Sequence, residues 1–208
     1  LIIGGQEIKT GKTEDVRSPH EHGRKLGFYH KAGKEEIRMA IEAARKARVT
    51  WSEMPMEHRA SIFLKAADLL ATKYRYVLNT ATMLGQSKNV MQAEIDSACE
   101  LIDFWRINVS YMTDIYRGQP PINPRGMWNR VEHRPLEGFV FAVTPFNFTA
   151  IGGNLPTAPA MLGNVVLWKP ASTAMLSAYY VMKILKEAGL PDGVINMIPG
   201  RGSELGDI

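Results

Sequence analysis

Two polar side chains with chemical potential follow apolar segments in the last third of this 208-residue chain. Asn147 stands in Thr-Pro-Phe-Asn-Phe, directly after an apolar run, and its carboxamide could donate hydrogen bonds to a developing oxyanion. Lys169 follows the next apolar run, and its ammonium could bind ribose hydroxyls or phosphate. Each residue also has a plainer interpretation, in which Asn147 caps a turn and Lys169 is a solvated side chain.

A glycine-rich stretch follows the third apolar run. Residues 200–206 read G-x-G-x-x-x-G, so Gly202 and Gly206 could let the backbone approach a pyrophosphate at the start of a helix. Glycine-rich turns between strand and helix are common. This motif therefore carries little weight by itself.

These three loops need a scaffold that brings them together. The apolar runs Phe139–Val143, Val165–Trp168 and Val194–Ile198 are short enough for strands, and helical patterns separate them. Alternating strands and helices predict an α/β fold with a parallel, Rossmann-like sheet. Ligands on such sheets bind at the carboxyl ends of the strands, where all three loops would lie.

The first part of the chain predicts a small hairpin followed by helices. The hairpin lies within Leu1–Val16 and turns at Gly4-Gly5, and Ser18-Pro19 marks a further turn. Helical spacing covers Lys34–Val49, a second helix begins near Pro55, and a third covers Tyr74–Leu84.

Turn and capping residues predict where some of these helices begin and end. Gly85 is expected to stop the third helix. In the last third of the chain, Ser172 or Thr173 is expected to cap a helix that Gly189 stops.

The longest helical pattern covers Asn89–Tyr116. Its apolar stripe predicts that Cys99 is a small buried thiol and not a nucleophile. Glu100 and Asp103 lie beside the stripe, where paired carboxylates usually form a solvated face. If this helix borders the mouth of a site, Glu100 could instead bind an ammonium group of a substrate. The stripe consists of Ile95, Ala98, Cys99, Ile102, Trp105, Val109 and Met112.

Composition excludes several classes of function. The formal charge is +4 and basic residues are interleaved with acidic ones, which argues against nucleic-acid binding. No apolar run approaches the roughly 20 residues that span a bilayer. The single cysteine forms no internal disulfide and fits a reducing compartment, and we expect no metal site.

Three motifs in sequence resemble the aldehyde dehydrogenase superfamily. They are residues 144–148, 163–170 and 189–196, which read TPFNF, GNVVLWKP and GLPDGVIN. The resemblance covers essentially the whole chain and implies the first part of an aldehyde-dehydrogenase-like fold. It implies a hairpin and helices over residues 1–117, an oligomerisation hairpin over 118–135, and the start of a Rossmann-like NAD-binding sheet over 136–208.

Residues 92–96, 100–104 and 148–155 are similar to the 1-pyrroline-5-carboxylate dehydrogenase branch of that superfamily. This branch oxidises glutamate semialdehyde to glutamate with NAD in proline catabolism. The family's cysteine nucleophile and glutamate base belong to motifs downstream of residue 208. We therefore expect the 208 residues alone to be inactive.

The resemblance also implies roles for single residues. Asn147 would stabilise the oxyanion, while Glu100 and Phe148 would hold the amino end and the aliphatic chain of the substrate. The expected NAD contacts are Thr144, Pro145, Phe146 and Lys169, with Ser172, Gly202 and Gly206 beside them.

One position departs from the family pattern. Many members have Ser-Glu after Lys-Pro, where the glutamate binds the adenosine ribose, and this chain has Ala171-Ser172. A neutral serine removes the repulsion that a carboxylate would exert on a 2′-phosphate. We expect a preference for NAD with measurable use of NADP.

Two alternatives stay open at this point. The substrate could be a different aldehyde, or the chain could be a non-catalytic nucleotide-binding or assembly module. An extended segment over Arg125–Arg134 with an exposed Trp128 predicts a homodimer or a higher homo-oligomer. The expected location is the cytoplasm of a bacterium or the mitochondrial matrix of a eukaryote.

Overall fold

The computed structural model describes residues 1–202. Its central sheet has five strands in the order β2-β1-β7-β6-β5. Strands β5, β6 and β7 are mutually parallel, and β1 runs antiparallel to β7. This arrangement confirms the three predicted strands and their parallel order. The bounds are β1 (Ile2–Ile3), β2 (Gln6–Glu7), β5 (Val140–Val143), β6 (Val166–Lys169) and β7 (Ile195–Met197).

The predicted amino-terminal hairpin is confirmed. Gly4 and Gly5 connect β1 to β2 with φ angles of 55° and 77°, which glycine adopts without steric cost. The hairpin extends the sheet that the last third of the chain builds. The proposed division of the chain at residues 117 and 135 stays a prediction.

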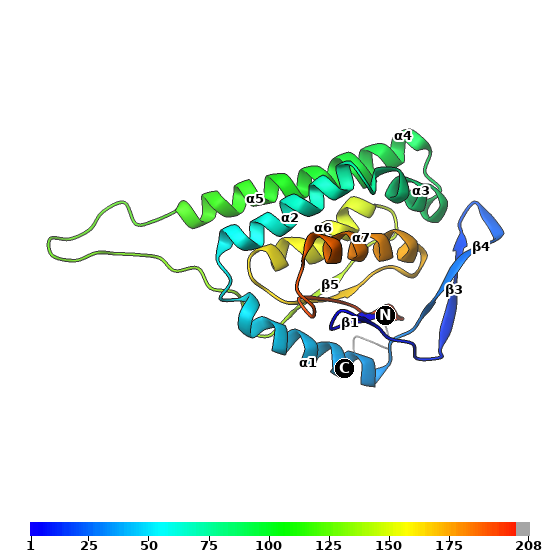
Figure 1. The fold of residues 1–208 in the computed structure, drawn as a ribbon, viewed down its shortest axis with the longest axis horizontal. Coiled ribbons are helices and arrows are strands. Elements are labelled where there is room, and N and C mark those ends of the chain that lie inside the picture. Colours follow the sequence, from blue (N-terminus) through cyan, green and yellow to red (C-terminus); the bar gives the residue numbers. More distant parts are fainter. Residues whose placement is uncertain (203–208) are drawn as a thin grey trace.

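A second, separate ribbon was missed by the sequence analysis. Strands β3 (Thr13–Ser18) and β4 (Glu21–His30) pair antiparallel and stand at one end of the molecule (Figure 1). The ribbon has a turn at the predicted Ser18-Pro19 position. Much of β4 is polar and exposed, so it carries no alternating apolar pattern that would have indicated a strand.

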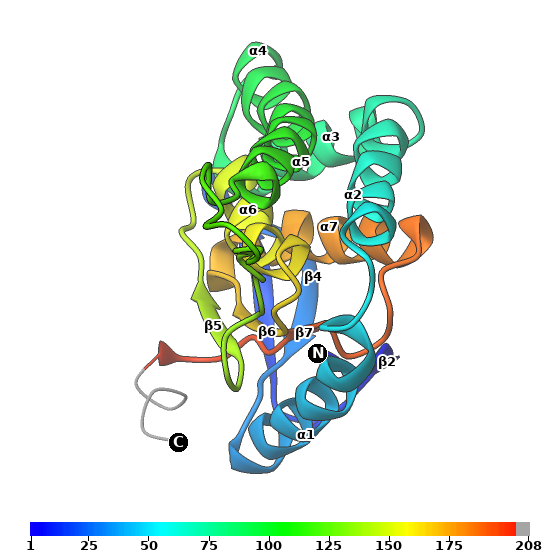
Figure 2. The ribbon, with the colours of Figure 1, turned by 90° about the vertical axis from the view of Figure 1, so that its left-hand side faces the viewer.

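Helices cover both faces of the sheet. Helices α6 and α7 connect the parallel strands on one face, α2, α3 and α5 form an outer layer over them, and α1 lies on the opposite face (Figure 2). The bounds are α1 (Lys34–Trp51), α2 (Met56–Ala71), α3 (Arg75–Gln86), α4 (Val90–Ala93), α5 (Leu101–Arg117), α6 (Thr149–Met161) and α7 (Met175–Ala188).

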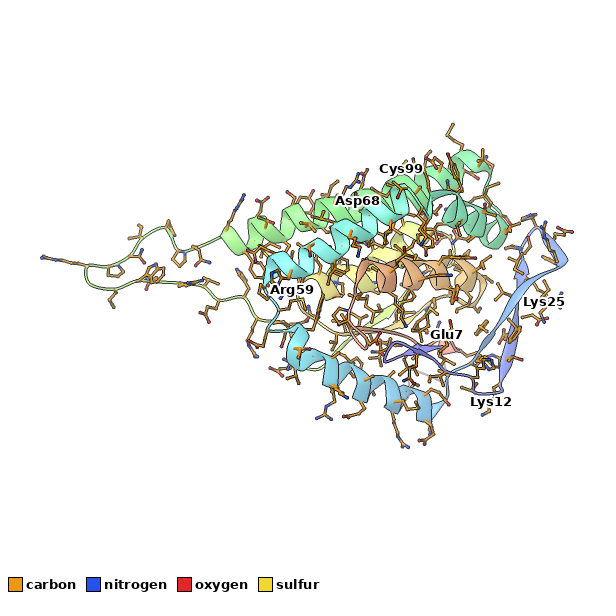
Figure 3. The ribbon with its side chains drawn as sticks, viewed as in Figure 1. Glu7, Lys12, Lys25, Arg59, Asp68 and Cys99 are labelled. Atoms are coloured by element: carbon orange, nitrogen blue, oxygen red, sulfur yellow. The ribbon has the colours of Figure 1, made fainter. Side chains whose placement is uncertain are left out.

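The longest helical pattern contains a π-helix, η1 (Glu94–Glu100), between α4 and α5. Its hydrogen bonds reach five residues back, so the apolar period of an α-helix is interrupted there. Ala98, Ile102 and Trp105 are buried as expected, but Ile95 and Cys99 are exposed. The prediction of a buried Cys99 is therefore wrong, and Figure 3 shows the residue on the outer helical layer.

Two predicted helix boundaries are also wrong. Gly85 does not stop α3, which continues to Gln86 before Ser87 adopts a left-handed φ of 56°. Neither Ser172 nor Thr173 caps α7, because both belong to a 3₁₀ turn, η2 (Ser172–Ala174), that precedes it. The predicted stop at Gly189 is confirmed by its φ of 105°.

A long loop projects from the body between α5 and β5 (Figure 1). The Gln119 side chain connects its two arms. Gln119 Nε2 donates to the carbonyl of Val131 at 3.2 Å, and Gln119 Oε1 accepts the N–H of Val131 at 3.0 Å. Asn123 accepts a further bond from the backbone of Asn129 at 2.6 Å. Trp128 is 77% exposed on this loop.

Candidate active site

The three loops named from the sequence follow three neighbouring parallel strands. Val143, the last residue of β5, pairs with Lys169, the last residue of β6, and Trp168 pairs with Met197 of β7. The backbone N–H of Thr144 donates to the carbonyl of Lys169 at 3.1 Å. The carboxyl ends therefore meet at one edge, as the parallel order requires.

Thr144 is tied to the sheet. It is buried, and its Oγ1 accepts a hydrogen bond from Trp168 Nε1 at 2.9 Å. A small hollow at this edge is lined by Thr144, Pro145, Phe148 and Pro170, among others. The loop after β5 thus has a fixed base beside an open surface.

The residues after this base face solvent. Asn147 is exposed, Phe146 is 65% exposed, and Phe148 is the extended residue that precedes α6. Among residues 1–202, no hydrogen-bond partner is assigned to the Asn147 carboxamide. Within the described residues, its donors therefore point to no protein acceptor and are open to solvent.

Lys169 and Gly202 lie close together. A Cβ added to Gly202 would stand 3.9 Å from Lys169 Cε, which is an ordinary van der Waals distance, so the two residues are direct neighbours. Lys169 makes no ion pair within the described part of the chain. Gly206 and the rest of the predicted glycine motif, residues 203–208, lie outside the described residues.

Ser172 faces Tyr29 of β4. Burial raises the pKa of Tyr29 to about 12, Glu14 adds to this rise, and Ser172 and Arg201 oppose it. Ser172 is itself exposed, next to the edge that carries Lys169. No carboxylate stands at the Ser172 position to repel a phosphate.

Glu100 and Phe148 approach the site from different elements and share one neighbour. Lys88 Nζ lies 4.2 Å from the centroid of the Phe148 ring. Burial raises the pKa of the half-buried Glu100 carboxyl, the charge of Asp96 raises it further, and the charge of Lys88 lowers it. Lys88 therefore contacts the Phe148 ring directly and acts on Glu100 through its charge.

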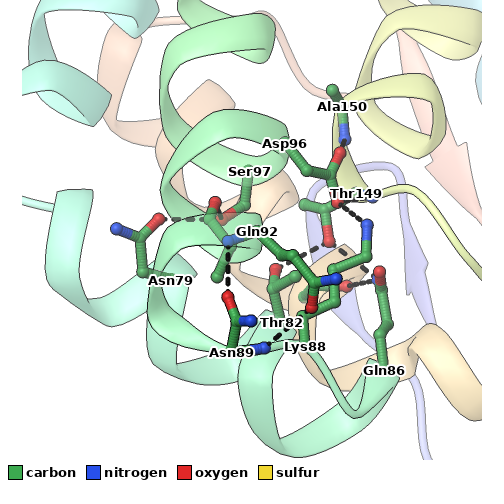
Figure 4. A network of polar contacts seen from close by, with 12 residues as sticks. Asn79, Thr82, Gln86, Lys88, Asn89, Gln92, Asp96, Ser97, Thr149 and Ala150 are labelled. Atoms are coloured by element: carbon green, nitrogen blue, oxygen red, sulfur yellow. Dashed lines mark hydrogen bonds and ion pairs between the residues drawn. The ribbon is translucent and has the colours of Figure 1, made fainter.

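Asp96 is a residue of this neighbourhood to which the sequence analysis gave no role. It is buried, its Oδ2 lies 2.7 Å from Lys88 Nζ, and its oxygens accept the N–H groups of Thr149 and Ala150 (Figure 4). Helical spacing alone gave no signal, because the π-helix alters which side chains point inward. Its only sequence signal was the QAEID segment in which it stands.

The residues at this edge fit a dinucleotide. Such folds bind nucleotides at the carboxyl ends of their parallel strands. This edge carries Lys169, which has no ion pair within residues 1–202, with Gly202 beside it and the buried Thr144 at the base of the next loop. An exposed carboxamide next to the loop adds a donor for a carbonyl oxygen. The fold and this edge define the class as an α/β protein with a parallel, Rossmann-like sheet of the kind that binds nucleotides.

Comparison with known families agrees with this class. The sequence profile of the Aldehyde dehydrogenase family matches residues 7–208. The chain therefore belongs to the aldehyde dehydrogenase family.

Two individual relatives show which members of the family the chain is similar to. The chain is 57% identical over 204 residues to delta-1-pyrroline-5-carboxylate dehydrogenase of Agaricus bisporus, covering 98% of the chain and 37% of that protein. It is 50% identical over 206 residues to the human mitochondrial enzyme of that name, covering 99% of the chain and 36% of the relative. The chain thus spans less than two-fifths of these relatives.

A solved structure agrees in detail. The crystal structure of the delta-pyrroline-5-carboxylate dehydrogenase of Mycobacterium tuberculosis bound with NAD superposes with a TM-score of 0.97 at 51% identity. The match covers 100% of this chain and 39% of that one. None of the helices within residues 1–202 is both long and apolar enough to cross a membrane.

Proposed function

We propose that the whole protein oxidises glutamate semialdehyde, the open form of 1-pyrroline-5-carboxylate, to glutamate with NAD in proline catabolism. The observation that carries this proposal is that Lys88 lies over the ring of Phe148, the residue next to Asn147, and also acts through its charge on Glu100. The similarity to relatives named for this substrate supports it.

Each residue has a chemical task in this reaction. The Glu100 carboxylate pairs with the ammonium group of the substrate, and the Phe148 ring contacts the aliphatic chain. The Asn147 carboxamide donates to the aldehyde oxygen as negative charge develops on it. These contacts orient the aldehyde before reaction and so lower the entropic part of the barrier.

The proposed cofactor surface consists of Thr144, Pro145, Phe146, Lys169, Ser172, Gly202 and Gly206. NAD, when bound, supplies the acceptor for a hydride from the substrate. Lys169 holds ribose hydroxyls or phosphate, while Gly202 leaves space for the close approach of the backbone. Because Ser172 is neutral, NADP is disfavoured only weakly.

The projecting loop supports an assembly proposal. Trp128 and Met127 are 77% and 62% exposed, which is a large apolar surface for a monomer. We propose a homodimer or a higher homo-oligomer formed through this loop. The proposed location is the mitochondrial matrix in a eukaryote, since the human relative is named as mitochondrial, or the cytoplasm in a bacterium.

The test is an assay of the whole protein with glutamate semialdehyde and NAD. NADH should form in proportion to the substrate consumed, and glutamate should be the product. If NADH forms with simple alkyl aldehydes but not with glutamate semialdehyde, the substrate is a different aldehyde. If no aldehyde is oxidised, the proposed enzymatic function is wrong.

A further inference from the structure

The start of α6 is held by an unusually complete set of contacts. Asp96 Oδ2 accepts the N–H of Thr149 at 3.0 Å, and Oδ1 accepts the N–H of Ala150 at 2.9 Å. These are the first two residues of α6, whose N–H groups have no partner within the helix. A negative charge at a helix N-terminus is also favourable.

The side chain of Thr149 is fixed as well. Its Oγ1 lies 2.7 Å from Thr82 Oγ1 and accepts a bond from Gln86 Nε2 at 2.8 Å, both from α3 (Figure 4). Thr149 is therefore anchored to η1 through its backbone and to α3 through its side chain. It follows Phe148 directly and Asn147 by two residues, so these anchors fix the end of the loop that carries both.

Lys88 completes the cluster. Its side chain is only 14% exposed, which is low for lysine, and its ammonium bridges Asp96 and the face of the Phe148 ring. Asp96 and Lys88 are also the charged groups that act on Glu100 within the described residues, with opposite effects on its pKa. One buried ion pair thus contacts or influences each group assigned to the substrate end.

We propose that the Asp96–Lys88 ion pair is a positioning device for this site. Asp96 fixes the start of α6 and thereby the direction of Asn147 and Phe148. Lys88 holds the Phe148 ring and offsets the repulsion between Asp96 and Glu100. The inference rests on the proposed function for what Glu100 and Phe148 bind, while the anchoring of α6 does not depend on the substrate.

The first arm of the test uses Asp96→Asn in the whole protein. The carboxamide keeps the shape and one acceptor oxygen but loses the charge and the second acceptor. Because Asn147 would serve any aldehyde, kcat should fall about tenfold with both glutamate semialdehyde and a simple alkyl aldehyde. Asp68→Asn is the matched control, since Asp68 forms a 2.8 Å ion pair with Arg106 on the exposed surface.

The second arm uses Lys88→Met and the pH dependence of KM. Without the ammonium, Asp96 acts on Glu100 unopposed, so Glu100 takes up its proton at a higher pH. The pH below which KM for glutamate semialdehyde rises should therefore move upward, while KM for the alkyl aldehyde keeps its profile. Lys73→Met is the control, because it removes a 2.6 Å ion pair with Glu187 elsewhere on the surface.

The third measurement, amide hydrogen exchange, does not depend on enzymatic activity. Amide hydrogen exchange at Thr149 and Ala150 should be faster in Asp96→Asn and unchanged in Asp68→Asn. Unchanged exchange, or a kcat within about twofold of wild type, would overturn the role of Asp96. An unshifted pH profile in Lys88→Met would overturn the role of Lys88.

These arms separate the inference from the proposed function. If the wild-type protein does not oxidise glutamate semialdehyde, the proposed substrate is wrong. The alkyl aldehyde and the exchange measurement still decide whether Asp96 positions the loop. If Asp96→Asn does not fold, Asp96→Glu tests the same anchor, because it keeps the charge but moves the carboxylate oxygens away from the N–H groups of Thr149 and Ala150, and it should also lower kcat with both aldehydes.

Discussion

At the scale of single residues, the exposed Asn147 is the group to which we assign the most direct chemical role. Its neighbours are fixed, through Thr144 on one side and Thr149 on the other, while its own carboxamide faces outward. A donor that is held in place before reaction stabilises developing charge at little reorganisation cost. The surrounding contacts thus fix the ends of the loop that carries Asn147, while its side chain stays exposed.

Replacing Asn147 by Ala in the whole protein should lower kcat about 10²–10³-fold, because one oxyanion donor is lost. KM should change much less. Steady-state kinetics with glutamate semialdehyde measure both constants. A loss of kcat smaller than about threefold would assign Asn147 a structural role instead.

Ser172 makes the second prediction at this scale. The wild-type protein should prefer NAD while still using NADP, because no carboxylate repels the 2′-phosphate. Ser172→Glu should lower kcat/KM for NADP by about tenfold or more and leave the value for NAD nearly unchanged. An equal or higher kcat/KM for NADP in the wild-type protein would contradict the expected preference.

At the scale of elements, the strands of the parallel sheet were easier to predict from the sequence than the polar β3–β4 ribbon or the helical turns around η1. The three parallel strands are short apolar runs bounded by Gly, Pro or polar residues, so local sequence defines them. The π-helix depends on tertiary contacts, since Asp96 faces inward to meet the start of α6. Regular α-helical spacing therefore predicted a buried Cys99, which is exposed, and gave no indication that Asp96 is buried.

The same distinction holds for the site. Thr144, Lys169 and Gly202 were predicted because they follow strands, and parallel strands end at one edge. The roles of Glu100 and Phe148 came from resemblance, because the two residues lie 48 positions apart on different elements. Lys88 joins them only in the folded chain.

Two glycines near β7 test how tightly this part is packed. Gly193 and Gly189 both have left-handed φ angles, of 87° and 105°. A Cβ at Gly193 would lie 2.8 Å from the carbonyl oxygen of Ala43, whereas a Cβ at Gly189 would meet nothing within 4 Å. The packing of α1 against the sheet therefore depends on Gly193.

Gly193→Ala should destabilise the protein by about 1–3 kcal/mol more than Gly189→Ala. Both variants carry the strain of a positive φ, so their difference isolates the contact with α1. Denaturant unfolding of the two variants of the whole protein measures this difference. Equal stabilities would show that α1 is not held against the sheet in this way.

At the scale of the whole molecule, the described residues include the edge that we propose binds a nucleotide, the residues that we propose bind the substrate, and a projecting loop. The sheet draws strands from both ends of the chain, since β1 and β2 lie beside β7. The loop extends far from this body and carries exposed apolar side chains (Figure 1). These features are consistent with a larger assembly in which the loop contacts another subunit.

Trp128→Glu should weaken that assembly, because a charge would be buried where an aromatic side chain packs. Light scattering should show a smaller average mass for the variant than for the wild-type protein. Tyr76→Glu is a matched control, since Tyr76 is 78% exposed on α3. A monomeric wild-type protein would contradict the assembly proposal.

The central claim is that Glu100 recognises the ammonium group of an amino aldehyde at this edge. The most direct measurement compares wild type with Glu100→Gln in the whole protein, using glutamate semialdehyde and a simple alkyl aldehyde with NAD across a range of pH. Because burial raises the pKa of Glu100, its carboxylate is lost as pH falls through a range above that of an ordinary glutamate.

In the wild-type protein, KM for glutamate semialdehyde should therefore rise as the pH falls through that range. In Glu100→Gln it should be high at every pH and lose this dependence, while KM for the alkyl aldehyde should stay nearly the same in both proteins. Equal changes in KM for the two aldehydes, or no change for either, would contradict the account.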